Sequence, residues 1–312
     1  MIFDEVAFWR DELSASPDIE TYRAVIPALA TTGGMLIGIS SPYAQRGLLY
    51  TKHQTHYGQE GDDVLVIQAE SRLLNPTLDE AVINAARVAD PESAAAEWFA
   101  EFRGDLSTFI ARSVIEHCVE SGQTERWAVR GQGYTAFADP SGGQHDSFTL
   151  AIGHKEGDLA VLDAVREWKA PFSPTDVVEE AARFLKEFNI TRVWGDKYAS
   201  GWVESAFGNL GIRYAHCDKN KSRLYLEALP LLTSHKVSLL DDPRLVNQIA
   251  QLERRTVRSG RDSVDHPPGA MDDLANAALG CLVYVASKPV ARDAPRTIRV
   301  EGVSGSYDVH TF

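Results

Sequence analysis

Four carboxylates in the second half of the chain combine a residue type and a position that suit chemistry. Asp139 ends the apolar stretch YTAFAD before a PSGG turn, and Asp196 ends the stretch RVWGD. Asp272 and Asp273 open a segment, LANAALGCLVYVA, that is apolar on nearly every side. Taken singly, each has an ordinary structural explanation, because aspartate is common in turns and at helix N-termini. Only their combination suggests a site.

The repulsion within such a set indicates which chemistry it could perform. The three positions are separated by 57 and 76 residues, and each lies at the end of an expected core element. A divalent cation relieves the repulsion between converging carboxylates, and hard oxygen ligands select Mg²⁺ or Mn²⁺ over zinc. Two such ions about 4 Å apart promote phosphodiester hydrolysis. The histidines show no paired spacing, so none of them is expected to bind a metal.

A mixed α/β sheet is expected to position these acids. The predicted strands are 134–138, 147–153, 159–168, 192–195 and 212–215. The predicted helices are 175–188, 201–210, 220–233, 242–253 and 271–286. The first three strands have turn residues between them and form a meander, and the rest alternate with helices. This order predicts a mixed sheet with helices on its faces.

The first part of the chain has a less regular pattern. Residues 33–41, GGMLIGISS, predict a short buried strand ending in a polar loop, and residues 63–68 predict another. Helices are predicted at 79–89 and 91–102. After Lys288 the chain is expected to be mostly unstructured, because proline, glycine and serine recur there.

The charge balance excludes a generally basic nucleic-acid coat protein but not a locally basic groove. The chain has 31 basic and 44 acidic residues, a net charge of −13. Residues 1–130 hold 10 basic against 20 acidic residues, whereas residues 131–312 hold 21 against 24. Most of the acidic excess therefore lies outside the region that carries the four aspartates. Residues 131–312 have a net charge of only −3, which two bound divalent cations would offset.

Hydropathy and cysteine usage predict a cytoplasmic protein. No apolar run approaches the roughly 18 residues of a membrane span, so no integral membrane association is expected. The acidic start does not resemble a secretory leader. The three cysteines are widely separated, which predicts reduced thiols rather than a disulfide framework.

The order of these elements and the motifs around the acids resemble one known family. Three strands, helix, strand, helix, strand and a terminal helix, with acids in FADPSGG, VWGDKY and GAMDDLANAAL, resemble the RNase H-like nuclease domain of tailed-phage terminase large subunits. The resemblance covers roughly residues 131–287. It implies that Asp139, Asp196, Asp272 and Asp273 bind two Mg²⁺ or Mn²⁺ ions. Asp272 is favoured over Asp273, because its register resembles that of the acid in related junction resolvases.

The N-terminal part resembles the latter half of the same family's ATPase. MIFDE resembles the end of a Walker B strand, with Asp4 and Glu5 in the acidic positions, and IGISSP, with Ser40 and Ser41, resembles the coupling motif. No G-x-x-x-x-G-K-[ST] loop is present in the sequence, so no productive ATP hydrolysis by this chain alone is expected. The resemblance implies a fragment: a gene whose start is lost or misplaced, or a split subunit completed by another chain.

The expected organisation and the expected DNA contacts complete this interpretation. The chain is divided into a truncated ATPase-like segment with linker, the nuclease domain and a tail, at residues 1–130, 131–287 and 288–312. Basic side chains near the acids are candidates for binding phosphates, although an ordinary solvated basic face explains them equally well. They are Lys197, Lys219, Lys221, Arg223, Arg254, Arg255, Arg258 and Arg261. The last four belong to ERRTVRSGRD, which predicts a hairpin around a Ser-Gly turn.

The function predicted from the sequence is a metal-dependent DNA endonuclease of the terminase type. It would cleave concatemeric viral DNA during genome packaging in the bacterial cytoplasm, with portal protein and small terminase subunit as possible partners. Two alternatives stay open. One is a catalytically silent prophage remnant or a module that docks on portal or small terminase, and the other is a different RNase H-like nuclease such as a junction resolvase.

Overall fold

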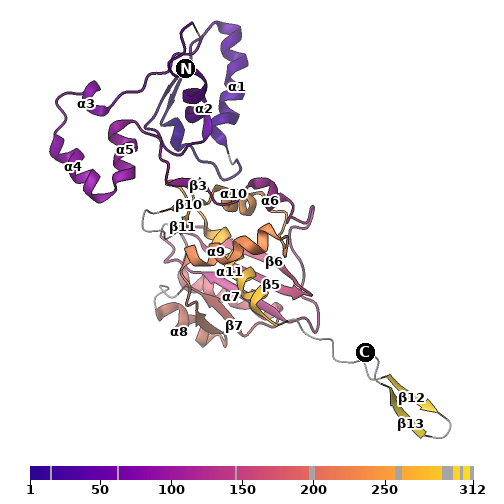
Figure 1. The fold of residues 1–312 in the computed structure, drawn as a ribbon. Coiled ribbons are helices and arrows are strands. Elements are labelled where there is room, and N and C mark those ends of the chain that lie inside the picture. Colours follow the sequence, from indigo (N-terminus) through magenta and orange to yellow (C-terminus); the bar gives the residue numbers. More distant parts are fainter. Residues whose placement is uncertain are drawn as a thin grey trace.

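The centre of the protein is a six-stranded mixed sheet (Figure 1). The computed structural model describes residues 1–14, 16–61, 63–144, 146–196, 201–256 and 262–289, and the backbone of 298–302 and 305–309. In the sheet order β8-β7-β4-β5-β6-β9 the strands are β8 (Arg213–His216), β7 (Arg192–Gly195), β4 (Tyr134–Asp139), β5 (Phe148–Glu156), β6 (Leu159–Trp168) and β9 (Val237–Ser238). The meander β4-β5-β6 is antiparallel, and β7 runs parallel to β4 and to β8. This topology confirms the predicted RNase H-like sheet.

Helices cover both faces of the sheet. On one face lie α7 (Pro174–Glu187) and α8 (Gly201–Asn209), and on the other lie α9 (Lys221–Thr233), α10 (Pro243–Gln251) and α11 (Asp273–Ser287). Successive side chains of a strand point to opposite faces. Ala136 and Ala138 therefore pack in the α7/α8 core, whereas Phe137 packs in the core beneath α11. The strands and helices predicted between 134 and 286 are all present, with ends shifted by a few residues.

Helix α11 lies directly on the meander. It packs against β4, β5 and β6, and most of its residues are buried. Gly280 makes the close approach possible, because a Cβ atom at this position would lie 2.8 Å from the ring of Phe137. The two acids at the start of the helix are thereby held near the end of β4.

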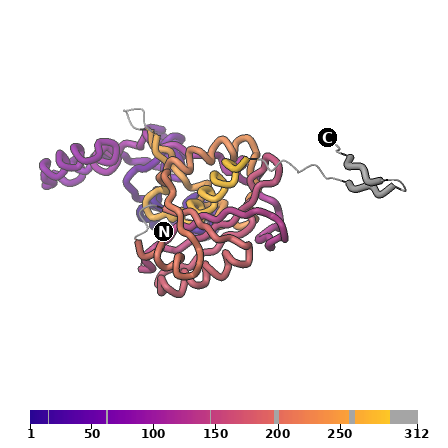
Figure 2. Tube along the Cα trace, turned by 90° about the horizontal axis from the view of Figure 1, so that it is seen from below, coloured from indigo at the N-terminus to yellow at the C-terminus, as the bar shows by residue number. Residues whose placement is uncertain are grey.

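The N-terminal segment has small elements of its own. They are β1 (Ile2–Asp4), the 3-10 helix η1 (Val6–Phe8), α1 (Pro17–Thr32), β2 (Ile37–Ile39), α2 (Gly47–His56), α3 (Ser71–Leu74), α4 (Glu80–Ala89) and α5 (Pro91–Phe99). Strands β1 and β2 pair in parallel. Figure 2 shows the purple part of the chain that contains α4 and α5 reaching out from the sheet domain.

Two predictions for this segment are wrong. The strand predicted within 33–41 forms as β2, but it is not buried: Ile37 and Ile39 are 47% and 53% exposed, because β1 is its only neighbour in the described part of the chain. Residues 63–68 form no strand, and Leu65 and Ile67 are 82% and 77% exposed. An apolar stretch becomes a strand only where a neighbouring strand takes up its backbone hydrogen bonds.

A second, three-stranded sheet joins the N-terminal segment to the region that contains the six-stranded sheet. β10 (Glu253–Thr256) and β11 (Asp262–Asp265) form the predicted hairpin, and β3 (Leu106–Thr108) adds a third antiparallel strand. After it, α6 (Arg112–Glu116) contributes Ile115 to the core beneath α11. A residue before position 131 therefore packs in the same core as α11, and the domain boundary expected at residue 131 stays a prediction.

The C-terminal tail contains regular backbone structure. β12 (Ile298–Gly302) and β13 (Gly305–Val309) pair as an antiparallel hairpin. The expectation of a mostly unstructured tail is wrong for these ten residues, because Ile298 and Val300 alternate with charged residues in the pattern of a strand. Among the described helices, none is long and apolar enough to cross a bilayer.

Candidate metal centre

Two of the predicted acids lie at the ends of neighbouring parallel strands. Asp139 is the last residue of β4, and Asp196 follows β7, whose Gly195 is the register partner of Ala138. A side chain on Gly195 would not fit, because its Cβ would lie 2.6 Å from the carbonyl oxygen of Ala138 and would overlap the hydroxyl of Tyr214. That hydroxyl donates to the backbone oxygen of Asp196 at 3.1 Å. The two strands thus bring these acids together at one sheet edge.

The other two acids reach the same edge from helix α11. Asp272 occupies the N-cap position without a side-chain capping hydrogen bond, and Asp273 is the first residue of the helix. The Thr149 hydroxyl of β5 donates to the backbone oxygen of Asp273 at 2.8 Å. One turn further along the helix, Asn276 donates from Nδ2 to Oδ2 of Asp139 at 2.8 Å. Helix and sheet are therefore joined by hydrogen bonds at the acidic positions.

The pKa values of two carboxyls reflect this convergence. Burial raises the pKa of Asp139 to about 7, and the charges of Asp273, Asp272 and Asp196 act in the same direction, against the hydrogen bond from Asn276. Burial and then the charge of Asp272 raise the pKa of Asp273 to about 6. The charges of the other three predicted aspartates therefore all act on Asp139, and the ionised forms of Asp139 and Asp273 are disfavoured without a compensating cation.

The residues present fit a divalent cation. Oδ2 of Asp273 is buried and has no hydrogen-bond partner among the described residues, and the same holds for Oδ1 of Asn276. Buried polar atoms are normally paired. Carboxylate and amide oxygens are the hard ligands that Mg²⁺ and Mn²⁺ prefer. An ion bound here would be a partner for the free oxygen of Asp273 and would offset the repulsion between the carboxylates around Asp139.

Asp272 and Asp273 differ in their partners although they are adjacent in sequence. Asp272, which is 5% exposed, accepts from the Tyr225 hydroxyl at 2.7 Å and pairs with Nζ of Lys221 at 3.0 Å. Although burial acts in the opposite direction, Asp272 and Asp265 raise the pKa of Lys221. The carboxylate favoured from the sequence therefore has a cation of its own, whereas Asp273 has an unpartnered oxygen.

A second group of ligand-type atoms adjoins Asp272. Oxygens of Asp265 and Asp272 and a ring nitrogen of His266 lie within 4.8 Å of one another. Lys221 also pairs with Asp265, at 2.7 Å, so a positive charge already lies among these atoms. The sequence analysis gave Asp265 no role and expected none of the histidines, including His266, to bind a metal. The available signal was their position at the end of strand β11, where Asp265 is the last residue and His266 follows, a few residues before the aspartate pair.

Glu167 and Asp146 are further acids near Asp273 that sequence reasoning missed. Their charges contribute to the raised pKa of Asp273. Glu167 lies in β6 opposite Thr149 and accepts from the Ser147 hydroxyl at 2.9 Å. A carboxylate near the end of the third meander strand, beside the strand that contacts α11, could have been found from the predicted strand register.

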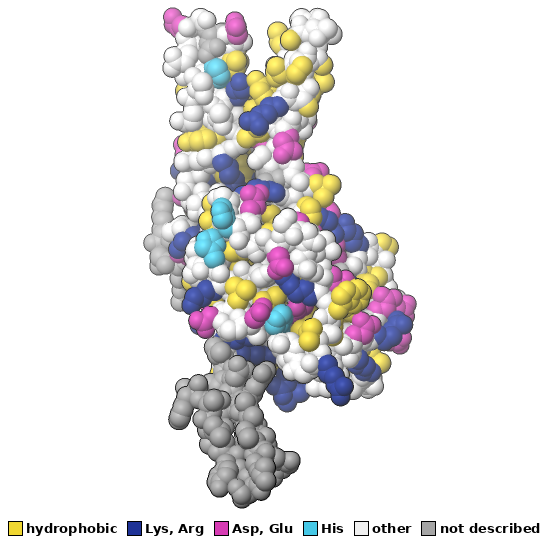
Figure 3. Space-filling model, turned by 90° about the vertical axis from the view of Figure 1, so that its right-hand side faces the viewer, with side chains coloured by type: hydrophobic (Ala, Val, Ile, Leu, Met, Phe, Trp, Pro, Cys, Tyr) yellow, Lys and Arg dark blue, Asp and Glu magenta, His cyan; other side chains and the backbone are white. Residues whose placement is uncertain are grey.

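The basic residues predicted to bind DNA form ion pairs within the chain. Lys219 and Arg223 pair with Glu227, Arg254 with Asp262, and Arg255 with Asp105, in addition to Lys221 in the acidic cluster. Lys197, Arg258 and Arg261 lie outside the described residues. On the face in Figure 3, basic and acidic side chains are interspersed rather than gathered into one basic patch. Phosphate binding by these residues stays a prediction.

The four residues of the ATPase-like motifs also lie close together. Asp4 pairs in register with Ile39, the residue before Ser40. The Ser40 hydroxyl lies 3.3 Å from a carboxylate oxygen of Glu5 and donates to the backbone oxygen of Ser41 at 2.9 Å. The parallel pair β1-β2 therefore places both motifs at the same strand ends.

Comparisons with known proteins give matches in structure only. No protein-family model matches the chain, and no curated protein sequence is significantly similar. The large terminase nuclease from thermophilic phage G20c is 14% identical with a TM-score of 0.47, over 55% of this chain and 96% of that one. The HK97 bacteriophage large terminase is 16% identical with a TM-score of 0.46, over 89% and 69%. A large terminase from another thermophilic bacteriophage is 12% identical with a TM-score of 0.47, over 91% and 67%. Each of these three solved structures is of a phage large terminase or its nuclease, at 12–16% identity to this chain.

Proposed function

We propose that this chain is a metal-dependent DNA endonuclease of the phage terminase type. One observation carries the proposal: Asp139, Asp196, Asp272 and Asp273 converge at one edge of an RNase H-like sheet, and a buried oxygen of Asp273 has no partner among the described residues. A cluster of this kind is unfavourable by itself and becomes favourable around divalent cations. The motifs that surround the acids in the sequence support a phosphodiester substrate.

The chain's own residues bind and orient in this proposal. Asp139, Asp196 and Asp273 supply ligand oxygens, with Asp272 beside them, and Asn276 orients the carboxylate of Asp139. Lys221 pairs with Asp272, and the Tyr225 hydroxyl donates to it. Two bound Mg²⁺ or Mn²⁺ ions would supply an activated water and charge stabilisation at the leaving oxygen.

Double-stranded DNA is the proposed substrate. Arg223 and Arg255 are 69% and 45% exposed at the side chain, so each can exchange its carboxylate partner for a phosphate. Concatemeric viral DNA as the natural substrate, the bacterial cytoplasm as the location, and portal protein and small terminase as partners belong to the same proposal. ATP hydrolysis by this chain alone is not part of it.

A plasmid-nicking assay tests the proposal. The purified full chain is incubated with supercoiled plasmid and MnCl₂, beside Asp139→Asn, Asp273→Asn and Asp158→Asn. Asp158 is an exposed acid in the turn between β5 and β6 and serves as the matched control. We expect nicking by the wild type and the control and none by the two site variants. Equal nicking by all four proteins, or none by the wild type, overturns the assignment; nicking confined to branched DNA favours a junction resolvase.

A further inference from the structure

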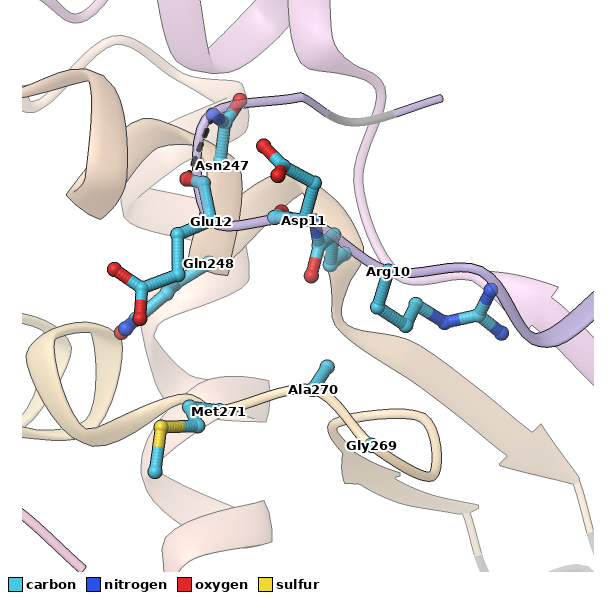
Figure 4. Close-up of a pocket in the computed structure, with 9 residues that line it drawn as sticks. Arg10, Asp11, Glu12, Asn247, Gln248, Gly269, Ala270 and Met271 are labelled. Atoms are coloured by element: carbon cyan, nitrogen blue, oxygen red, sulfur yellow. Dashed lines mark hydrogen bonds between the residues drawn. The ribbon is translucent and has the colours of Figure 1, made fainter. Parts of the chain in front are cut away.

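Helix α10 holds a loop of the N-terminal segment through one polar face. The Asn247 amide donates to the backbone oxygen of Glu12 at 3.1 Å (Figure 4), and the Gln251 amide donates to the backbone oxygens of Asp11 and Ser14 at 3.0 and 3.1 Å. Arg244, one turn before Asn247, donates from Nε to the Glu12 carboxylate at 2.9 Å. Positions i, i+3 and i+7 share one face of a helix, so these contacts form a continuous row.

The loop lies across a pocket from the residues that lead into the acidic pair. The pocket has a volume of about 150 Å³, and Arg10–Glu12 line it opposite Gly269–Met271, directly before Asp272 (Figure 4). α10 closes it through Asn247, Gln248 and Gln251. The oxygen of the Gln248 amide accepts from the backbone N–H of Ala275 in the first turn of α11 at 3.0 Å. α10 therefore contacts both the loop and the acidic end of α11.

Arg244 forms ion pairs with both the N-terminal loop and the six-stranded sheet. Its guanidinium pairs with Glu12 of the loop through Nε and with Glu167 of β6 through Nη1. Glu12 is 48% exposed, whereas Glu167 is only 8% exposed at the side chain. The buried partner depends on Arg244 for compensation, because its other hydrogen-bond donor, the Ser147 hydroxyl, is neutral.

Glu167 in turn lies beside the proposed metal ligands. It is the register partner of Thr149, whose hydroxyl donates to the backbone of Asp273. The negative charge of Glu167 therefore adds to the potential at Asp273, by an amount that depends on how closely Arg244 neutralises it.

We propose that Arg244 is a positioning residue of the acidic site, and that the N-terminal loop at residues 11–14 controls it through Glu12. The N-terminal segment thereby sets the affinity of the site for divalent cations. The metal-affinity part of this inference rests on the proposed function; the contact between loop and site does not.

Each substitution is expected to change the cation affinity in a definite direction, because Glu12 and Glu167 share the guanidinium of Arg244. Without the charge of Glu12, Arg244 pairs with Glu167 alone and neutralises it more completely, so the cation affinity falls. Without Arg244, Glu167 remains buried and uncompensated beside Asp273, so the folded protein attracts a cation more strongly. The Glu12 carboxylate also pairs with Lys169 at 3.1 Å, but Arg244 is the cation that it shares with Glu167. Replacing Arg244 removes this shared pairing, which makes the two substitutions non-additive.

A double-mutant cycle on the full chain tests the inference. Mn²⁺ affinity is measured by calorimetric titration with MnCl₂ for the wild type, Glu12→Gln, Arg244→Gln and the double variant. Arg112→Gln is the matched control, because Arg112 contacts Asn247 of α10 and lies in an exposed ion pair with Glu116. We expect about threefold weaker binding in Glu12→Gln, about tenfold tighter binding in Arg244→Gln, and no further change in the double variant.

A metal-free measurement separates this inference from the proposed function. Hydrogen exchange of the backbone N–H of Ala275 is measured without metal in the same variants. We expect Glu12→Gln to change its protection only when Arg244 is present. If Mn²⁺ does not bind but this pattern is seen, the proposed function fails and the link between loop and site stands. Equal effects of Glu12→Gln with and without Arg244, or an Arg244→Gln effect no larger than that of Arg112→Gln, overturn the inference.

Discussion

Asp272 and Asp273 are adjacent in the sequence, but the two sides of the acidic cluster to which they belong have different partners. On the α9 side, Asp272 has Lys221 and Tyr225 as partners. On the sheet side, Asp273 has an unpartnered buried oxygen, and the pKa of Asp139 is raised to about 7 by burial and by neighbouring negative charge. Asp272 therefore has its partners within the chain, whereas burial and repulsion disfavour the charged forms of Asp139 and Asp273, which a bound cation would offset. This difference distinguishes a carboxylate with partners inside the chain from one with an unpartnered oxygen, and metal binding by either stays a prediction.

The largest expected effect is on the uncompensated side. Asp273→Asn is expected to lower plasmid nicking at least about 100-fold and to abolish the Mn²⁺-dependent rise in melting temperature, because it removes a ligand oxygen and its charge. Without metal, the same variant is expected to be more stable than the wild type, since repulsion is relieved. Nicking and differential scanning fluorimetry check this, with Asp158→Asn as control; unchanged metal stabilisation in Asp273→Asn contradicts the comparison.

Substitution of Asp272 is expected to have the opposite effect on the stability of the metal-free protein. Asp272→Asn removes the carboxylate that Lys221 and Tyr225 face, so the metal-free protein is expected to lose about 1–3 kcal/mol of unfolding free energy. Urea denaturation without metal measures this loss. If Asp272→Asn instead stabilises the metal-free protein as Asp273→Asn does, the two carboxylates are equivalent and the distinction fails.

The pH dependence of stability sharpens the same contrast. Asp139 and Asp273 have folded-state pKa values of about 7 and 6, above the usual 3.8, so the folded protein binds more protons than the unfolded chain between these values. Stability without metal is therefore expected to fall as the pH rises from 4 to 7. Thermal melts across this range should show a shallower fall in Asp139→Asn, and saturating Mn²⁺ should oppose it. A slope unaffected by Asp139→Asn contradicts the assignment of the titration to this site.

The smallest effect is expected from Tyr225→Phe. The change removes one hydrogen bond to Asp272 while Lys221 stays in place, so a loss of about 1 kcal/mol is expected, with Mn²⁺ affinity nearly unchanged. Urea denaturation and calorimetry on the same preparation measure the two quantities. A large loss of Mn²⁺ affinity would mean that Asp272 is itself a principal ligand.

Sequence patterns were most informative in the sheet domain and least informative in the N-terminal segment. Strand alternation and turn residues are local, so β4, β5, β6 and β7 could be predicted from the residues that form them. Residues 63–68 have the apolar content of a strand, but a strand also needs a neighbour, which the local sequence does not specify. The pairing of β3 with β10 connects residues that are almost 150 positions apart, and no short pattern indicates it.

The sequence by itself determined the residue types and the order of elements that bring Asp139, Asp196 and the aspartate pair to one edge, because strand ends and helix starts are encoded nearby in the chain. Only the tertiary structure decided which acid is compensated. Asp272 and Asp273 are neighbours on a helix, but successive helical positions point in different directions. The packing of α9, about 50 residues away in the chain, places Lys221 beside Asp272. The packing of α10 allows the guanidinium of Arg244 to pair with both Glu12 and Glu167. Such pairings depend on how distant helices are rotated against one another.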